Sequence, residues 1–187
     1  MGYHTFDAED AQRLEKAGSR YRYLSREELV EPLNVSERSA IVDLGSGTGF
    51  YTDDVAPYVD RVYAVDVQES MHEFYRDKGV PENVELVTST VAEMPFGENQ
   101  LDGAFSTMTY HEFATEDALT RIAHSLAPGS RLVIADWTAD GEGAAGPPVT
   151  ERFSASEVVE SLTDHGFEIV SASPRPETFL VVADFIE

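Results

Sequence analysis

A loop with three glycines at every second position, Asp-Leu-Gly-Ser-Gly-Thr-Gly at residues 43–49, is the segment best suited to bind a ligand. Glycine lets the backbone turn sharply and approach a ligand without a clash from Cβ. A helix that follows the loop would point its free N–H groups at that ligand. The candidate binding residues of the loop are Asp43, Gly45, Ser46, Gly47, Thr48 and Gly49.

The acids beside this loop indicate which cofactor it binds. Asp66 ends the next apolar run, where an acid can bind ribose hydroxyls, and Val67 follows it. Dinucleotide sites usually have the spacing G-x-G-x-x-G, which brings the backbone to a pyrophosphate. Here the spacing is G-x-G-x-G, and Asp43 before it suits a cationic amino-acid tail and disfavours a pyrophosphate. The pattern therefore predicts S-adenosylmethionine; the alternative is an ordinary turn, with Asp66 as a surface acid.

His111 and Glu112 are the candidate catalytic residues for the methyl transfer that this cofactor would supply. Such a transfer is an in-line displacement, for which an enzyme mainly aligns the reactants and excludes water. A base is needed when the acceptor arrives protonated, and His111 would take that proton while Glu112 orients its ring. The alternative is that His111 packs under the cofactor without a role in proton transfer. Thr107, just before this pair, is expected to contact the cofactor.

Four residues are expected at the rim of the acceptor site: Tyr21, Tyr110, Trp137 and Arg152. Trp137 follows the fifth apolar run and would either wall the acceptor or cover the edge of the sheet. Arg152 would pair with an anionic acceptor or with its neighbour Glu151. Tyr21 lies in a segment of aromatics and arginines that would form a lid or simply pack. No two histidines have metal-ligand spacing with a nearby acid, so no metal is predicted.

These residues need a framework that brings them to one edge, and the apolar runs supply it. Short apolar runs alternate with helical segments and a hairpin closes the chain. This predicts an α/β fold with a mostly parallel sheet, an antiparallel last strand and helices on both faces. Ligands of such sheets bind at the carboxyl ends of the strands. Strands are expected at 40–44, 61–66, 84–88, 101–106, 131–137, 167–172 and 178–186. Helices are expected at 8–17, 51–59, 69–77, 116–126 and 154–165, and after a capping box at 25–28.

The same motifs resemble those of a known family, the class I S-adenosylmethionine-dependent methyltransferases. The first two motifs are matched at 41–49 and 62–66, and the quinone-methylating and type 11 branch at 92–96, 101–105 and 126–132. The resemblance covers residues 38–137 and implies a Rossmann-like seven-stranded sheet of order 3-2-1-4-5-7-6. Many relatives have an aspartate where this chain has Thr90. The adenine contact is therefore expected from the Thr90 hydroxyl or the Val91 backbone.

The composition limits both the partners and the chemistry. The 187 residues include 35 acidic and 13 basic residues, for a net charge of −22, and no cysteine. The absence of cysteine excludes disulfides, thiolate metal sites and iron–sulfur clusters. Dispersed acids and scarce lysine favour adaptation to high salt and a halophilic source; the alternative is an acidic face for a cationic partner. A surface this negative repels phosphates, so no nucleic-acid substrate is expected.

Length and pattern together predict one domain and one activity. Residues 1–37 would form a helical lid, 38–137 the cofactor-binding core, and 138–187 a rim loop, a helix and the terminal hairpin. No apolar run is long enough to span a bilayer and no secretory signal is found, so a cytoplasmic protein is expected. The expected activity is methyl transfer to a small molecule. The alternatives are a non-catalytic cofactor-binding module, a protein side-chain methyltransferase and a nicotinamide-dependent oxidoreductase.

Overall fold

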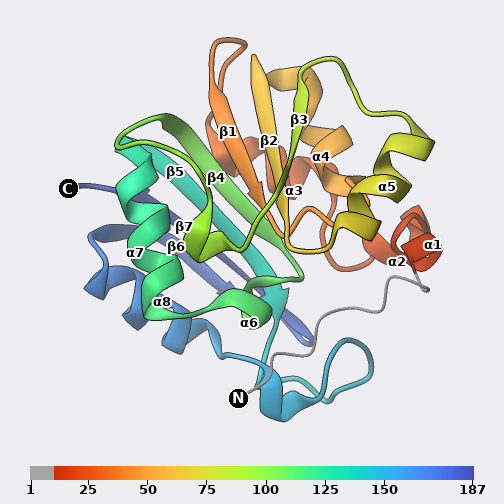
Figure 1. Ribbon diagram of the computed structural model, residues 1–187. Coiled ribbons are helices and arrows are strands. Elements are labelled where there is room, and N and C mark those ends of the chain that lie inside the picture. Colours follow the sequence, from red (N-terminus) through yellow and green to blue (C-terminus); the bar gives the residue numbers. More distant parts are fainter. Residues whose placement is uncertain (1–10) are drawn as a thin grey trace.

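Seven strands form one sheet in the order β3-β2-β1-β4-β5-β7-β6 (Figure 1). The computed structural model describes residues 11–187, so the predicted helix start at Ala8 and the first ten residues of the predicted lid lie outside the described residues. β7 runs antiparallel to both β5 and β6, and the other neighbours are parallel. This confirms the expected order and its antiparallel strand. The strands are β1 (Ala40–Leu44), β2 (Arg61–Asp66), β3 (Val84–Thr88), β4 (Leu101–Thr107), β5 (Leu126–Trp137), β6 (Phe167–Pro174) and β7 (Thr178–Phe185).

Both capping boxes expected from the sequence begin helices, because each N-cap serine and the glutamate three residues later satisfy each other's backbone N–H groups. The prediction of a helix over 51–59 is wrong beyond Val55. The helix ends there, and the next three residues, which include Pro57, form a 3-10 turn. The helices are α1 (Ala11–Leu14), α2 (Ala17–Arg20), α3 (Arg26–Leu33), α4 (Phe50–Val55), α5 (Glu69–Lys78), α6 (Tyr110–Phe113), α7 (Glu116–Ser125) and α8 (Ala155–Asp164), with 3-10 turns at Ala56–Tyr58, Val91–Glu93 and Val149–Glu151. Within residues 11–187, no helix is long and apolar enough to cross a bilayer.

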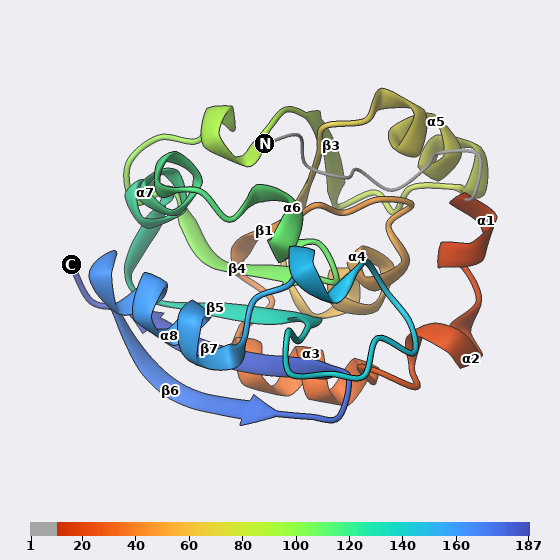
Figure 2. The same cartoon turned by 90° about the horizontal axis from the view of Figure 1, so that it is seen from below.

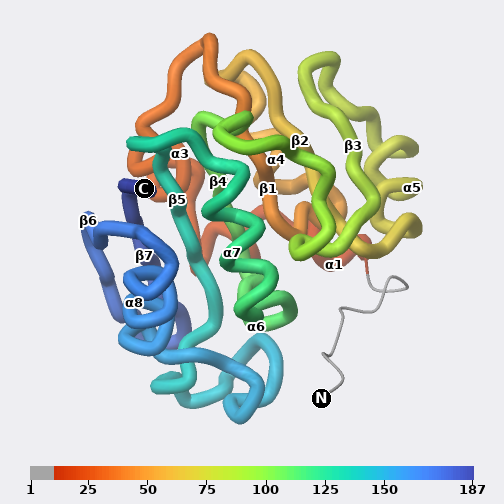
Figure 3. Tube along the Cα trace, turned by 60° about the vertical axis from the view of Figure 1, so that its left-hand side comes forward, coloured from red at the N-terminus to blue at the C-terminus, as the bar shows by residue number. Residues whose placement is uncertain are grey.

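The central strands of the sheet are buried on both faces, whereas the edge strands β3 and β6 are partly exposed. α7 and α8 cover one face, and α3 and α4 cover the other (Figure 3). Alternate residues of a strand point to opposite faces. In β5, Leu132 and Ile134 therefore pack with α7 and α8, whereas Val133 and Ala135 pack with α3 and α4. This two-sided burial explains why the strands read as continuous apolar runs.

The strands deliver their functional residues to one edge of the sheet, the lower edge in Figure 1. The order changes direction between β1 and β4, whose following segments turn to opposite faces of the sheet. Such a switch point leaves a crevice at the carboxyl ends of the strands. Figure 2 looks onto this edge, where α1 and α2, α6 and the segment after β5 surround it. The fold thus positions the site between these four parts of the chain.

Candidate active site

The glycine loop between β1 and α4 adopts a backbone that two of its glycines make possible. Gly45 has φ +79°, and a Cβ there would lie 2.3 Å from Thr109 Cγ2. Gly49 also has φ +79°, and a Cβ there would lie 2.0 Å from the Tyr75 ring. A side chain at either position would meet both steric conflict and an unfavourable left-handed backbone. The loop can therefore sit tightly between β4, α5 and a ligand.

Asp66, at the end of β2, connects the glycine loop to β2 through a backbone hydrogen bond. Its Oδ2 accepts a hydrogen bond of 2.8 Å from the Gly47 N–H, and its Oδ1 accepts one of 2.8 Å from the Gln68 N–H. Burial raises the pKa of Asp66, and the two backbone donors oppose that rise. Asp66 also lines the cavity described below. Its oxygens have lone pairs left for further donors, as the role expected for it with ribose hydroxyls requires.

Three buried polar atoms around the glycine loop lack a hydrogen-bond partner: Arg20 Nε, Asp43 Oδ1 and Ser46 Oγ. The other Asp43 oxygen accepts from the Thr52 hydroxyl at 2.6 Å, and burial raises the pKa of Asp43 to about 7. Buried polar groups without partners are costly and are rare in folded proteins. The ammonium and carboxylate of S-adenosylmethionine would satisfy an acid, a guanidinium and a hydroxyl, so this donor set fits the cofactor.

Arg20, in α2, is a site residue that the sequence interpretation missed. Its guanidinium lies 4.8 Å from the centre of the Tyr51 ring and lines the cavity. The charge of Asp43 acts on it, while burial lowers the pKa of Arg20. The signal in the sequence was the mixture of arginines and aromatics at 19–24, which did not distinguish one arginine from another.

A cavity of about 730 Å³ opens at this edge of the sheet. The α1–α2 segment, the glycine loop, the turn from β4 into α6 and residues 145–151 bound it. This volume is typical of a site for a cofactor or drug-sized ligand. The structure brings nine of the residues expected from the sequence to its wall: Gly45, Ser46, Gly47, Thr48, Asp66, Thr107, His111, Glu112 and Trp137.

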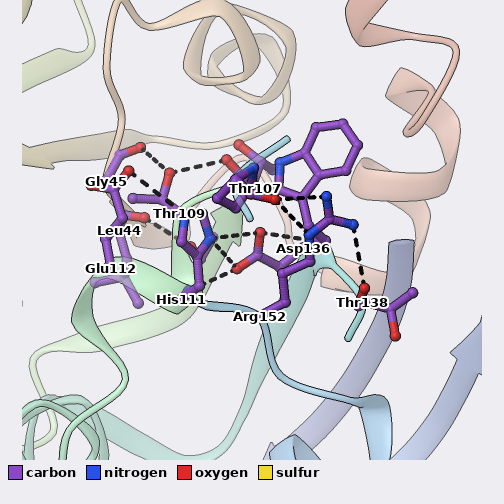
Figure 4. A network of polar contacts seen from close by, with 12 residues as sticks. Leu44, Gly45, Thr107, Thr109, His111, Glu112, Asp136, Thr138 and Arg152 are labelled. Atoms are coloured by element: carbon purple, nitrogen blue, oxygen red, sulfur yellow. Dashed lines mark hydrogen bonds and ion pairs between the residues drawn. The ribbon is translucent and has the colours of Figure 1, made fainter. Parts of the chain in front are cut away.

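His111 forms a buried pair with Asp136, the acid at the end of β5. Its Nδ1 lies 2.9 Å from Asp136 Oδ2 and 3.1 Å from Oδ1. Figure 4 shows the two side chains pointing toward each other. The carboxylate is fixed by two backbone donors, the N–H groups of His111 and Trp137, each at 2.7 Å. Because a carboxylate only accepts, Nδ1 carries the hydrogen and neutral His111 has a free lone pair on Nε2. Asp136, which the sequence interpretation missed, thus sets the tautomer of His111.

The turn that carries His111 is strained at Met108. This residue has φ +61°, which is unfavourable for a side chain other than glycine. The Met108 N–H donates to the Ala135 carbonyl at 2.7 Å, and the next residue, Thr109, packs its side chain against Gly45. The strained turn therefore couples the glycine loop to α6, whose first residues include His111.

Some expected rim and cofactor residues lie elsewhere. Tyr110 is buried in the core, where its ring packs on Phe113 and Phe153, because α6 turns this side chain under the sheet edge. Tyr21 donates to both oxygens of Asp54 and packs on Phe50, outside the cavity wall. The structure therefore does not place these two tyrosines on the cavity wall, and their role at an acceptor rim stays a prediction.

Four residues that were expected to contact the cofactor do not line the cavity: Asp43, Val67, Thr90 and Val91. The Thr90 hydroxyl donates to Glu93, and Val91 packs in the core. Val67 is half exposed at the end of β2. Asp43 lies under the glycine loop, within the sheet. Their contacts with a cofactor stay predictions.

Arg152 fastens the segment after β5 and does not face the cavity. Its guanidinium donates to the carbonyls of Thr138, Ala145 and Pro147 and pairs with Glu177 at 3.4 Å. Its side chain is 1% exposed. The carbonyls and one carboxylate thus take up its donors, and the expected role of Arg152 in binding an anionic acceptor stays a prediction.

We expect Arg152→Met to destabilise the protein by about 3 kcal/mol, because it removes the guanidinium that partly buried carbonyls and the Glu177 carboxylate share. Urea unfolding measures the loss, and limited proteolysis should locate new cleavage within residues 141–150. Arg61→Met is the matched control, since Arg61 pairs with Glu85 on the surface and should cost less than about 1 kcal/mol. Equal losses in the two variants would contradict the fastening role.

Comparisons with known proteins agree with this geometry. The profile of a methyltransferase domain family matches residues 42–134. An O-methyltransferase of Aspergillus nomiae is 29% identical over 84% of this chain and 77% of its own length. An O-methyltransferase of Penicillium expansum is 29% identical over 75% of this chain, which spans 56% of that relative. A crystal structure of a methyltransferase from Aquifex aeolicus is 28% identical, with a TM-score of 0.85 over 97% of this chain and 100% of that one.

The sheet order, the glycine loop and the cavity at its edge define the class I S-adenosylmethionine-dependent methyltransferases. The chain belongs to the methyltransferase domain family that matches its central half. This confirms the resemblance seen in the sequence motifs, and with it S-adenosylmethionine as the cofactor. Among residues 11–187, no group of three or more histidines and acids is placed to hold a metal ion.

Proposed function

We propose that the protein transfers a methyl group from S-adenosylmethionine to a hydroxyl group of a small-molecule acceptor, with His111 as the general base. One observation carries this proposal: the buried His111–Asp136 pair opens into the same cavity as the glycine loop. The names of two relatives, both O-methyltransferases, support a hydroxyl acceptor.

The cofactor, when bound, supplies a methyl group activated on a sulfonium. The chain's own residues then have separate tasks. Arg20, Asp43 and Ser46 hold the two charges of the amino-acid tail, and Asp66 accepts from the ribose. His111 Nε2 accepts the proton of the acceptor hydroxyl as the oxygen becomes nucleophilic.

The surroundings of His111 favour its protonated form. Burial works to lower the pKa of His111, but the hydrogen bond and charge of Asp136, together with the charges of Glu112 and Glu151, raise it above its ordinary value. Glu112 Oε1 lies 3.9 Å from Nε2, on the side of the ring away from Asp136. A raised pKa makes the imidazole a stronger base towards a weakly acidic hydroxyl.

These positions support a separate role for each of the three parts of the chain. The α1–α2 part of residues 1–37 acts as a lid over the cofactor, residues 38–137 bind it, and the segment from 138 supplies the acceptor wall. Leu14 lies against Gly47, and the Thr48 hydroxyl donates to Glu15, which supports the lid role. A cytoplasmic location, a high-salt source and the lack of a nucleic-acid substrate stay predictions from composition.

Calorimetry with S-adenosylhomocysteine followed by transfer of a labelled methyl group tests the proposal. We expect micromolar binding and a labelled methyl ether when hydroxylated small molecules are offered. Tight binding of NAD, with none of S-adenosylhomocysteine, would instead favour an oxidoreductase. Binding without transfer to any acceptor pool, small molecules and proteins included, would favour a non-catalytic module.

A further inference from the structure

The outer part of the lid, residues 11–19, is exposed and has little regular structure of its own. The helices α1 and α2 have four residues each, and within residues 11–19 Ala11 alone is buried. Helices this short are unstable by themselves in water. The position of this outer lid over the glycine loop therefore depends on contacts that particular side chains make.

Glu15, between α1 and α2, joins the outer lid to two other parts of the chain. Its Oε1 accepts a hydrogen bond from the Thr48 hydroxyl in the glycine loop. Its Oε2 lies 3.2 Å from the Nζ of Lys78, the last residue of α5. The side chains of Glu15 and Lys78 are 26% and 21% exposed. The pair therefore lies close to the surface, where water can take its place.

Lys78 is held in position by α4 and by its own helix. Its Nζ lies 2.8 Å from Asp53 Oδ2 and 4.6 Å from the centre of the Tyr75 ring. The Tyr75 hydroxyl donates to the other Asp53 oxygen at 2.6 Å. A cation at the C-terminal end of a helix is also stabilised by the helix dipole. The ammonium is thus fixed beside the place that Glu15 occupies when the outer lid lies on the glycine loop.

The inner end of the lid, residues 20–24, is held by buried contacts instead. The buried Tyr51 hydroxyl donates to the carbonyls of Arg20 and Leu24, at 3.1 Å and 2.9 Å, and the Leu24 side chain is fully buried. Separating these groups would expose apolar surface and leave buried polar groups without partners. Separating a partly exposed ion pair costs much less. An opening of the lid would therefore break the contact between Glu15 and Lys78 and leave the inner end in place.

From these features we infer that Glu15 and Lys78 form an ionic latch that keeps the outer lid closed over the bound cofactor, and that opening of this latch limits cofactor release. Arg13, Lys16 and Ser19 of the outer lid line the cavity, so its closure covers the cofactor side of the cavity. The inference rests on the proposed function, since it takes the α1–α2 segment as the lid over the cofactor. It assigns a positioning role to two residues that do not themselves line the cavity.

The rate at which S-adenosylhomocysteine leaves immobilised protein, measured by surface plasmon resonance, tests the latch. We expect Lys78→Met to release it about tenfold faster, because the variant loses two partly exposed ion pairs. Lys78→Arg keeps the charge and should stay within about threefold of wild type. Arg76→Met is the matched control, since Arg76 lies on the same helix and pairs with Glu69 on the surface. Release from Lys78→Met at the rate of this control, or equally fast release from Lys78→Arg, overturns the inference.

Glu15→Gln tests whether the two residues act as one unit. Glutamine keeps an oxygen that can accept from the Thr48 hydroxyl and removes the charge that faces Lys78. We expect this variant to release S-adenosylhomocysteine about fivefold faster than wild type. The double variant Glu15→Gln/Lys78→Met should release it no faster than Lys78→Met alone, because the second change removes a contact that is already lost. Effects that multiply in the double variant overturn the pairing.

Limited digestion with trypsin tests the latch without any ligand, and so separates its failure from a failure of the proposed function. Lys16 lies in the exposed outer lid, and mass spectrometry should show its cleavage about threefold or more faster in Lys78→Met than in wild type or Arg76→Met. Equal cleavage in all three overturns the latch. If cleavage differs as expected but wild-type protein does not bind S-adenosylhomocysteine, the proposed function fails while the contact between Glu15 and Lys78 still holds the lid.

Discussion

Replacing His111 with alanine is expected to lower kcat about a thousandfold and to leave the affinity for S-adenosylhomocysteine within about twofold of wild type. The variant loses the proposed base, Nε2, so turnover falls. The affinity for the cofactor is kept because His111 contacts Asp136, whereas the residues proposed to bind the cofactor tail lie around the glycine loop. The two backbone donors of Asp136 remain in the variant, so the end of β5 should keep its structure. Steady-state kinetics and calorimetry measure the two effects. Full turnover in the variant would remove the base role and leave His111 as a packing residue.

The pH dependence of the same reaction follows from the direction of the pKa shift. A general base must be neutral, so kcat should rise with pH through the pKa of His111 and level off above it. Since Asp136, Glu112 and Glu151 raise this pKa, the rise should be centred above the ordinary value for histidine. Asp136→Asn removes the charge that contributes most to the raised pKa and should move the midpoint to lower pH. A midpoint that does not move in this variant would contradict the pairing.

Replacing Gly45 with alanine is expected to weaken S-adenosylhomocysteine binding about a hundredfold, which corresponds to about 3 kcal/mol. Two costs combine: a left-handed backbone with a side chain, and a Cβ that would lie 2.3 Å from Thr109 Cγ2. Either Thr109 or the loop must move, and both lie on the cavity wall. Calorimetry measures the loss of affinity, and thermal unfolding measures any accompanying loss of stability.

Gly79→Ala separates the two costs, because Gly79 has φ +103° but no atom within 4 Å of the added Cβ. We expect this control to lose some stability and to keep its cofactor affinity. Adding Thr109→Ser to Gly45→Ala removes the nearest methyl group and should restore part of the binding. If Gly45→Ala behaved like Gly79→Ala, the close approach of the loop to Thr109 would not matter for the cofactor.

Most of the framework could be predicted because a parallel sheet that is covered on both faces gives apolar runs with clear ends. β1, β2 and β3 have the bounds expected from the sequence. β5 begins at Leu126, earlier than expected, because Pro128 and Gly129 read as a turn while the strand continues through an irregular register opposite β4. α6 was missed because its four residues are too few for a helical period.

The site residues could be predicted where each has a local signal in the sequence, such as the glycine spacing or a place at the end of an apolar run. The glycine loop carries its own local motif, whereas the His111–Asp136 pair joins residues that are 25 positions apart. A signal for Asp136 existed: like Asp43 and Asp66, it stands at the end of an apolar run. No comparable signal separated Arg20 from the other arginines, or showed that Arg152 would turn its donors to carbonyls, because these roles depend on tertiary contacts.

The segment that Arg152 fastens closes on itself at its base, where the Ala139 N–H donates to the Phe153 carbonyl at 3.0 Å and Thr138 lies beside Phe153. The two ends of the acceptor wall are therefore neighbours, and the strand and helix that flank it keep their places whatever lies between them. Loops of this kind tolerate changes in length and sequence. Changes within residues 140–151 could therefore reshape one side of the cavity while the glycine loop, which lies outside this segment, keeps its structure.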